Sequence, residues 1–287
     1  MEIYEAFLDG GEMLIPEYDV AGLLNGAEYN VSAAVKTIRN TVAAEWGGDF
    51  FFGGAYSAYF DAGADGEPEL VLRLEYDLPG EYTEPYYQIL FLKARDDALY
   101  LTADTWEYYR TGVEIGKNGF VQQGGGSSAM SSYFDYSYIN ELGHNVFLYS
   151  AEYSFGNAQA VIPDWYLPVD ETPEEYSGYD EYYSENGYEI DRYNFLNSDD
   201  YSFDDDKAWQ EYRQGFEYVM LDPSGKDAAV PEPFASLYAK LGITVMKEDD
   251  MLSRISEKCL SKGCAPEIIS AEPVEWTQLD KDWTPKG

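Results

Sequence analysis

Four carboxylates lie close together in the segment YFDAGADGEPEL, residues 59–70, which separates two apolar, strand-like runs. They belong to Asp61, Asp65, Glu67 and Glu69, and Gly66 occupies the sixth position counted from Asp61. Asp-rich loops with a glycine at this position wrap carboxylate and carbonyl oxygens around calcium. The spacing therefore predicts a calcium loop with side-chain ligands from Asp61, Asp65 and Glu69, and with the backbone carbonyl of Glu67.

The segment departs from a complete calcium loop at two positions. Gly63, at position three, has no side-chain oxygen, and position twelve is Leu72 instead of the bidentate glutamate of an EF-hand. These losses place the expected calcium affinity in the weak range, about 10⁻⁴ to 10⁻³ M. The alternative is an acidic β-turn without metal. The strand-like run that follows argues against an EF-hand, in which a helix would follow the loop.

The other reactive residues do not assemble a catalytic set. His144, the only histidine, lies in the turn-like segment ELGHNV, and neither cysteine belongs to a nucleophile signature. The glycine-rich segment QQGGGSS lacks the lysine of a phosphate-binding loop. Paired carboxylates, as in glycoside hydrolysis, will arise by chance among 54 acidic residues. We therefore expect no catalysis, with a carbohydrate-active enzyme that uses paired carboxylates as an alternative.

The two cysteines, Cys259 and Cys264, lie in the segment KCLSKGC. Residues five apart in a continuous helix cannot form a disulfide, so a bridge requires the helix to end near Cys259 and turn through Gly263. The sequence leaves a disulfide and two free thiols equally open. Two cysteines and a distant histidine do not make a zinc site.

The charge balance restricts the classes of partner. The chain has 18 basic and 54 acidic side chains and a net charge of −36. A field of this sign repels nucleic-acid phosphates and anionic lipids, whereas cations, basic peptides and neutral glycans stay compatible with it. No run approaches the roughly 18 apolar residues of a membrane span. We expect no nucleic-acid binding and no membrane insertion by this chain.

Hydrophobic periodicity predicts an α+β fold. Apolar residues recur every three or four positions over residues 31–46, which indicates an amphipathic helix that Asn30 or Ser32 caps and Gly47 ends. Between residues 54 and 157, short runs rich in Tyr, Phe, Leu and Val alternate with turn segments. This pattern is typical of an antiparallel meander sheet, and the helix is expected to pack on it.

The composition changes twice in the second half of the chain. Residues 164–206 contain fifteen acidic residues and one arginine, with tyrosines interleaved, and are expected to be a connector. The segment NGYEIDRYNFL within it is compatible with a strand. Helical patterns follow after residue 206 and over residues 233–241 and 247–260. The predicted organisation is a sheet domain over residues 1–163, an acidic connector over 164–206, and a mainly helical region over 207–287.

A helix followed by YSAYFDAGADGEPELVL, tyrosine-rich strands and QQGGGSSAMSSYFDY resembles a group of secreted or lipid-anchored proteins of Gram-positive gut bacteria. The signature of that group is a FYDLDGDGTPEL-like loop. The resemblance covers about residues 1–220 and implies an α+β fold and an extracellular or cell-surface location. It implies no activity.

These observations order three functional hypotheses. The first is an extracytoplasmic, non-catalytic binding protein for a protein or glycan ligand, with a weak calcium loop or no cofactor. The second is a cytoplasmic, acidic, immunity-type protein that neutralises a basic partner, since charge complementarity accelerates such association. The third is the carbohydrate-active enzyme described above.

Overall fold

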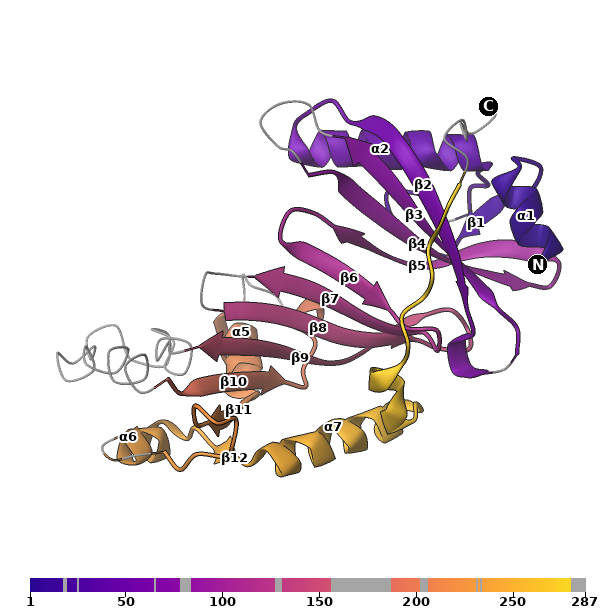
Figure 1. Cartoon of the computed structure of the whole chain (residues 1–287). Coiled ribbons are helices and arrows are strands. Elements are labelled where there is room, and N and C mark those ends of the chain that lie inside the picture. The colour runs from indigo at the N-terminus through magenta and orange to yellow at the C-terminus, as the bar shows by residue number, and fades with distance from the viewer. Residues whose placement is uncertain are drawn as a thin grey trace. The chain divides into compact units, whose positions relative to one another are not determined.

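The structure is a computed structural model of the whole chain. It describes residues 1–17, 20–24, 26–64, 66–77, 84–126, 131–155, 187–201, 206–230, 232 and 234–279. The fold is α+β, as the periodicity predicts, with mostly antiparallel sheets and flanking helices (Figure 1). Among the described residues, no helix combines the length and apolarity needed to cross a membrane.

The chain divides into two compact units. Unit 1 comprises Met1–Gln123, Ser137–Val146 and Glu267–Gly287, and unit 2 comprises Gly124–Tyr136 and Phe147–Pro266. This division differs from the predicted boundaries at residues 163 and 206. Strand pairing joins segments that are distant in the sequence, so composition shifts along the chain do not mark the ends of the units. Residues 164–186 and 202–205 of the predicted connector lie outside the described residues, and its residues 189–194 form a strand.

Unit 1 is built on a six-stranded sheet in the order β1-β5-β4-β3-β2-β13. The strands are β1 (Leu14–Pro16), β2 (Phe51–Phe60), β3 (Glu69–Asp77), β4 (Tyr86–Arg95), β5 (Ala98–Glu107) and β13 (Thr277–Gln278). β2 to β5 form the predicted antiparallel meander, and β1 pairs with β5 in parallel. The helices of this unit are α1 (Glu2–Leu8) and α2 (Val31–Trp46).

Helix α2 begins and ends where the sequence predicts. The side-chain oxygen of Asn30 accepts a 2.8 Å hydrogen bond from the backbone N–H of Ala33, and Gly47 ends the helix in the left-handed conformation, with φ of 72°. Val31, Val35 and Ile38 are buried in the core. The Tyr76 hydroxyl donates a 3.2 Å hydrogen bond to the Val35 carbonyl, which joins the helix to β3.

Both faces of the unit 1 sheet are buried at its centre. One face packs α1 and α2 against alternate residues of β3 and β4, such as Leu72 and Leu90. Residues of the opposite parity, such as Val71 and Phe91, pack with Ile115, Val121 and Ile139. Two buried faces explain why β3 and β4 read as almost continuous apolar runs instead of alternating ones.

A second, seven-stranded sheet has the order β12-β11-β10-β9-β8-β7-β6. Its strands are β6 (Thr111–Ile115), β7 (Phe120–Gly126), β8 (Ser131–Ile139), β9 (Asn145–Phe155), β10 (Glu189–Asn194), β11 (Phe216–Leu221) and β12 (Val245–Met246). The unit 2 helices are α5 (Asp206–Gln214), α6 (Phe234–Leu241) and α7 (Glu248–Lys262). Among the described residues, the short 3₁₀ segments are η1 (Ala62–Ala64), η4 (Ser198–Asp200) and η5 (Pro266–Ser270). The predicted helices at 233–241 and 247–260 are confirmed by α6 and α7. The helical pattern after residue 206 predicts a helix that continues through Val219, but the helix α5 ends at Gln214 and residues 216–221 form the strand β11.

Helices α5 and α7 cover opposite faces of the strands of unit 2. On one face, the Asn194 side chain donates a 3.0 Å hydrogen bond to the carbonyl of Tyr212 in α5. On the other, Arg254 of α7 forms a 2.6 Å ion pair with Glu217 of β11. Between the strands, Tyr136 and Tyr149 stack with their ring centroids 4.4 Å apart. The tyrosine-rich composition thus supplies much of this core.

Candidate functional site

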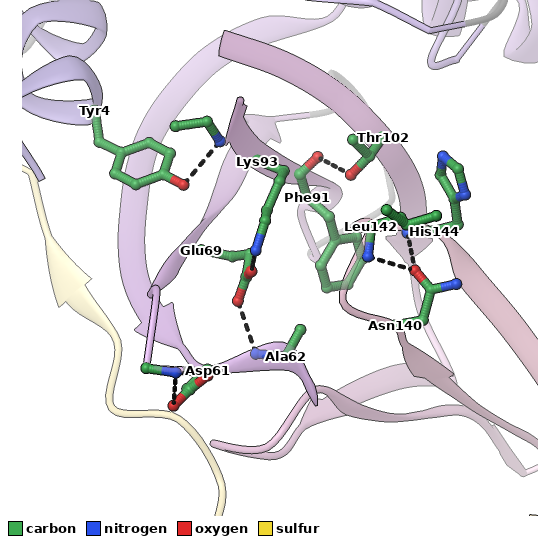
Figure 2. A network of polar contacts seen from close by, with 12 residues as sticks. Tyr4, Asp61, Ala62, Glu69, Phe91, Lys93, Thr102, Asn140, Leu142 and His144 are labelled. Atoms are coloured by element: carbon green, nitrogen blue, oxygen red, sulfur yellow. Dashed lines mark hydrogen bonds and ion pairs between the residues drawn. The ribbon is translucent and has the colours of Figure 1, made fainter. Parts of the chain in front are cut away.

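The acidic loop between β2 and β3 turns tightly. Gly63 lies in the left-handed region within η1. Both carboxylate oxygens of Asp61 accept a hydrogen bond from the backbone N–H of Gly66, each with an N···O distance of 3.2 Å (Figure 2). Glu67 is exposed, and Asp65 lies outside the described residues. Within the described part of the chain, no three His, Cys, Asp or Glu side chains come together as a metal site. Calcium binding by Asp61, Asp65, Glu67 and Glu69 stays a prediction.

Glu69, the fourth predicted ligand, is held by protein donors. Its side chain is buried at the start of β3, where Oε2 accepts a 2.7 Å hydrogen bond from the N–H of Ala62. The Nζ atom of Lys93 on β4 forms an ion pair with Oε1 (Figure 2). Lys93 is also buried, with 5% of its surface exposed. The pair therefore neutralises the Glu69 charge without a metal ion.

The single histidine lies in a turn, as expected, and has an acidic partner. His144 Nε2 is 2.7 Å from Glu17 Oε2, and the other Glu17 oxygen forms an ion pair with Arg95. Burial raises the pKa of Glu17, but the hydrogen bonds from Arg95 and His144 outweigh it and lower the pKa. This arrangement neutralises Glu17 and ties the segment after β1 to the turn before β9.

A different place in unit 1 offers a cavity of about 400 Å³. It lies on the α2 face of the sheet, where the end of that helix meets the start of β4 and the end of β5. Its lining residues are Ala21, Gly22, Thr41, Val42, Glu45, Tyr86, Gln88, Asp104 and Trp106. We call this cavity the α2 pocket. Its volume lies in the usual range for small-molecule sites.

Asp104 is the central polar group of the α2 pocket. Its Oδ2 atom accepts a 2.8 Å hydrogen bond from Gln88 Nε2, and the backbone of Ala21 donates a second. The Gln88 amide is itself fixed, because Tyr86 donates to its Oε1 atom at 2.7 Å. Burial raises the pKa of Asp104 to about 6, although both hydrogen bonds lower it. The carboxylate is thus positioned by neutral donors, none of which neutralises its charge.

Aromatic rings form one wall of the pocket. Tyr86 and Trp106 stack with an interplanar angle of 14° and a centroid separation of 6.4 Å. The Trp106 side chain is 40% exposed, so part of its ring is accessible from the solvent. Burial raises the pKa of Tyr86, and the nearby carboxylates of Asp104 and Glu45 raise it further. The pocket therefore combines two acidic groups with an accessible aromatic face.

The turn at residues 21–22 closes the pocket with strained backbone. Ala21 has φ of 51° and Gly22 has φ of 74°, both in the left-handed region. A Cβ atom on Gly22 would lie 2.4 Å from Thr41 Oγ1, so only glycine fits this close approach to α2. The Ala21 conformation is costly for a residue with a side chain, and such strain often marks a functional site.

Sequence reasoning missed Asp104, Gln88 and Trp106. A signal was present for Gln88, which follows the alternation of Tyr86, Leu90 and Leu92 toward the core face of β4. Asp104 carried no such signal, because a β-bulge in β5 shifts the register between Leu101 and Ala103, and simple alternation from Leu101 would place Asp104 on the other face. Polar residues at core positions are unusual unless a partner or a ligand satisfies them. The candidate ligands named from the sequence lie in the loop between β2 and β3, which does not line the α2 pocket.

No family model matches the chain, and no curated protein or solved structure matches it either. The function is therefore inferred from the site alone.

Proposed function

We propose that the protein is a non-catalytic, extracytoplasmic binding protein whose α2 pocket holds the cationic group of a ligand. The observation that carries this proposal is Asp104, a pocket carboxylate whose hydrogen-bond donors among the described residues are neutral. Among the lining residues there is no lysine or arginine. A ligand ammonium or guanidinium group would supply the missing positive charge.

The rest of the pocket suits the same ligand. The Trp106 ring is exposed at the pocket, and a cation over an indole face gains about 0.5–2 kcal/mol, depending on how far it is desolvated. Glu45 adds a second negative charge at the helix end. The net charge of −36 attracts cationic ligands over longer distances and accelerates their encounter.

Binding of simple probes tests the proposal. We suggest titrating the full chain with arginine amide and cadaverine as cationic probes, and with cellobiose as a neutral probe, by calorimetry near pH 8. The cationic probes are expected to bind, and Asp104→Asn is expected to weaken them by about tenfold or more, because it removes the partner charge. Binding should also weaken below about pH 6, where Asp104 takes up a proton.

Glu114→Gln is the matched control, because it removes one negative charge from an exposed position of unit 1 outside the pocket. It is expected to leave affinity nearly unchanged. Equal losses in Glu114→Gln and Asp104→Asn would mean that the probes sense the general field and not the pocket. If neither cationic probe binds, the proposal is rejected.

A carbohydrate-active enzyme is the second candidate, favoured by one observation. The α2 pocket contains two carboxylates, Asp104 and Glu45, beside an aromatic wall, the combination that glycosidases use. A proton-donating carboxylic acid with a pKa near 6 also fits general acid catalysis. Hydrolysis of aryl glycosides by the wild type, and loss of this activity in Asp104→Asn, would support the enzyme. Binding of cellobiose without hydrolysis would argue against it.

The extracytoplasmic location in this proposal comes from the first of the three hypotheses drawn from the sequence, and a separate experiment tests it. An immunity-type protein in the cytoplasm could use the same acidic pocket to hold a basic side chain of its partner. Fractionation of source cells with an antibody to the protein distinguishes the two. Recovery in the surface or medium fraction is expected, and recovery with cytoplasmic markers would favour the immunity-type alternative.

A further inference from the structure

Helix α7 of unit 2 ends in a specific backbone motif. Gly263 adopts the left-handed conformation with φ of 90°, and its N–H donates a 3.1 Å hydrogen bond to the Leu260 carbonyl. The N–H of Cys264 donates a 3.0 Å hydrogen bond to the Cys259 carbonyl. These two bonds define a Schellman cap, in which the residue after the glycine folds back over the last turn of the helix.

The side chains that meet across this cap are both cysteines. A Schellman cap usually brings together two apolar side chains, one in the last turn and one after the glycine. Here those positions hold Cys259, which is fully buried, and Cys264, which is 7% exposed. Cys264 Sγ donates a 3.3 Å hydrogen bond to the Cys259 carbonyl oxygen. Both are free cysteines in this structure.

The cap removes the obstacle that a continuous helix would pose to a disulfide between these cysteines. A disulfide needs Cα atoms about 4.4–6.8 Å apart and side chains directed at each other. In a continuous helix, residues five apart point about 140° away from each other. Because α7 stops at Lys262 and the chain reverses at Gly263, Cys264 instead returns to the last turn of the helix, where Cys259 lies.

We propose that Cys259 and Cys264 are a disulfide-forming site whose co-substrate is a low-molecular-weight disulfide such as oxidised glutathione. A thiolate of the pair attacks the glutathione disulfide and releases one reduced glutathione. The second thiolate then attacks the mixed disulfide, closes the Cys259–Cys264 bond and releases a second reduced glutathione. The protein loses two hydrogen atoms as the glutathione disulfide gains them.

Burial decides when this reaction happens. Burial raises the pKa of both thiols, that of Cys264 to about 12, so few thiolates are present in the folded state. The bond therefore forms while unit 2 folds or when the end of α7 opens, and it is shielded once formed. Disulfides persist in oxidising compartments and are rare in the reducing cytoplasm. The expectation that the bridge forms in cells therefore rests on the extracytoplasmic location proposed above, whereas its formation in vitro does not.

The redox equilibrium of the full chain tests the site. The reduced, urea-denatured protein is refolded in a series of glutathione redox buffers, quenched with acid, alkylated and weighed by mass spectrometry. A second series is kept in urea throughout. The folded protein is expected to favour the bridge by about tenfold or more over the denatured chain, because the cap holds the thiols together. Reduction should lower the melting temperature accordingly, by thermodynamic linkage.

Cys264→Ser supplies the control, because it keeps the shape of the cap and leaves one thiol. It should show at most a mixed glutathione adduct and no redox-dependent melting temperature. The proposal is overturned if folding does not increase bridging, if the bridged protein melts lower than the reduced protein, or if the folded chain accumulates only mixed adducts. None of these outcomes depends on the α2 pocket, so the two proposals fail independently.

Discussion

Two buried carboxylates of unit 1 show how the environment of a residue determines its use. Glu69 has a buried lysine partner and a backbone donor, and the resulting pair joins β3 to β4. Asp104 accepts hydrogen bonds from neutral donors, the Gln88 amide and the Ala21 backbone, and no cationic donor to it occurs among the residues that the structure describes. The first arrangement is complete without a ligand. The second leaves a negative charge that a ligand can neutralise, and so the α2 pocket is the stronger candidate site.

Asp104→Asn is expected to stabilise the protein above about pH 6 while it weakens binding of cationic ligands. The folded pKa is raised to about 6, so the folded state holds a proton that the unfolded state has lost between about pH 4 and pH 6. Stability therefore falls as pH rises through this window, and the loss is complete above it. Asp104→Asn has no carboxyl group to titrate, so it avoids this loss of unfolding free energy, which is about 1–3 kcal/mol. Urea unfolding at about pH 4 and pH 8 checks it, and equal stability changes at both pH values would contradict the assignment.

Lys93→Met is expected to destabilise unit 1 by about 3–5 kcal/mol, because it leaves the buried Glu69 charge without its partner. The double variant Lys93→Met/Glu69→Gln should recover much of this loss, since glutamine can still accept the Ala62 N–H. Urea unfolding of the single and double variants measures the difference. A double variant as unstable as Lys93→Met would show that the ion pair is not the cause.

At the scale of elements, helix α2 carries both the fold and the pocket. Its first turns pack on the sheet, and its last turns supply Thr41, Val42 and Glu45 to the lining. Asn30→Ala is expected to cost about 1 kcal/mol, because the Ala33 N–H loses its acceptor. Asn30→Asp keeps an acceptor and adds a favourable charge at the helix start, so it should cost little. Chemical unfolding would contradict the cap if both variants lost the same stability.

The loop between β2 and β3 stays a predicted calcium element. Thermal melts in millimolar calcium, in magnesium at equal ionic strength and in chelator provide the measurement. A ligand that binds only the folded state raises the melting temperature once its concentration exceeds the dissociation constant. Calcium should therefore raise it above the magnesium value, and Asp61→Asn should abolish the difference. Identical melts in calcium and magnesium would remove calcium from this loop.

At the scale of the whole molecule, the excess of 54 acidic over 18 basic side chains opposes compaction. Raising sodium chloride to about 0.5 M screens this repulsion and is expected to raise the melting temperature near neutral pH. The shift should shrink near pH 4, where many carboxylates are protonated. A melting temperature that falls with salt near neutral pH would mean that specific ion pairs, such as those of Lys117 with Glu272 and Glu275, outweigh the general repulsion.

The sequence alone determined the features that depend on neighbours along the chain. The 3.6-residue period and the capping residues Asn30 and Gly47 located α2, and the same reasoning located α6 and α7. Short, tyrosine-rich runs with turn residues between them indicated the antiparallel strands. Net charge set the class of compatible ligands. Periodicity, caps and turns depend on neighbouring residues, and net charge is a sum over the chain, so these signals can be read without knowledge of the fold.

Only the tertiary structure decided which side chains meet. The α2 pocket combines Gly22, Glu45, Gln88 and Asp104, which come from four separate segments that strand register and helix packing bring together. Lys93 became the partner of Glu69 in the same way, through pairing of β3 with β4. Even Cys259 and Cys264, five residues apart, needed the end of α7 to be fixed before their thiols could be placed. Register and packing depend on contacts distant in sequence, which periodicity does not encode.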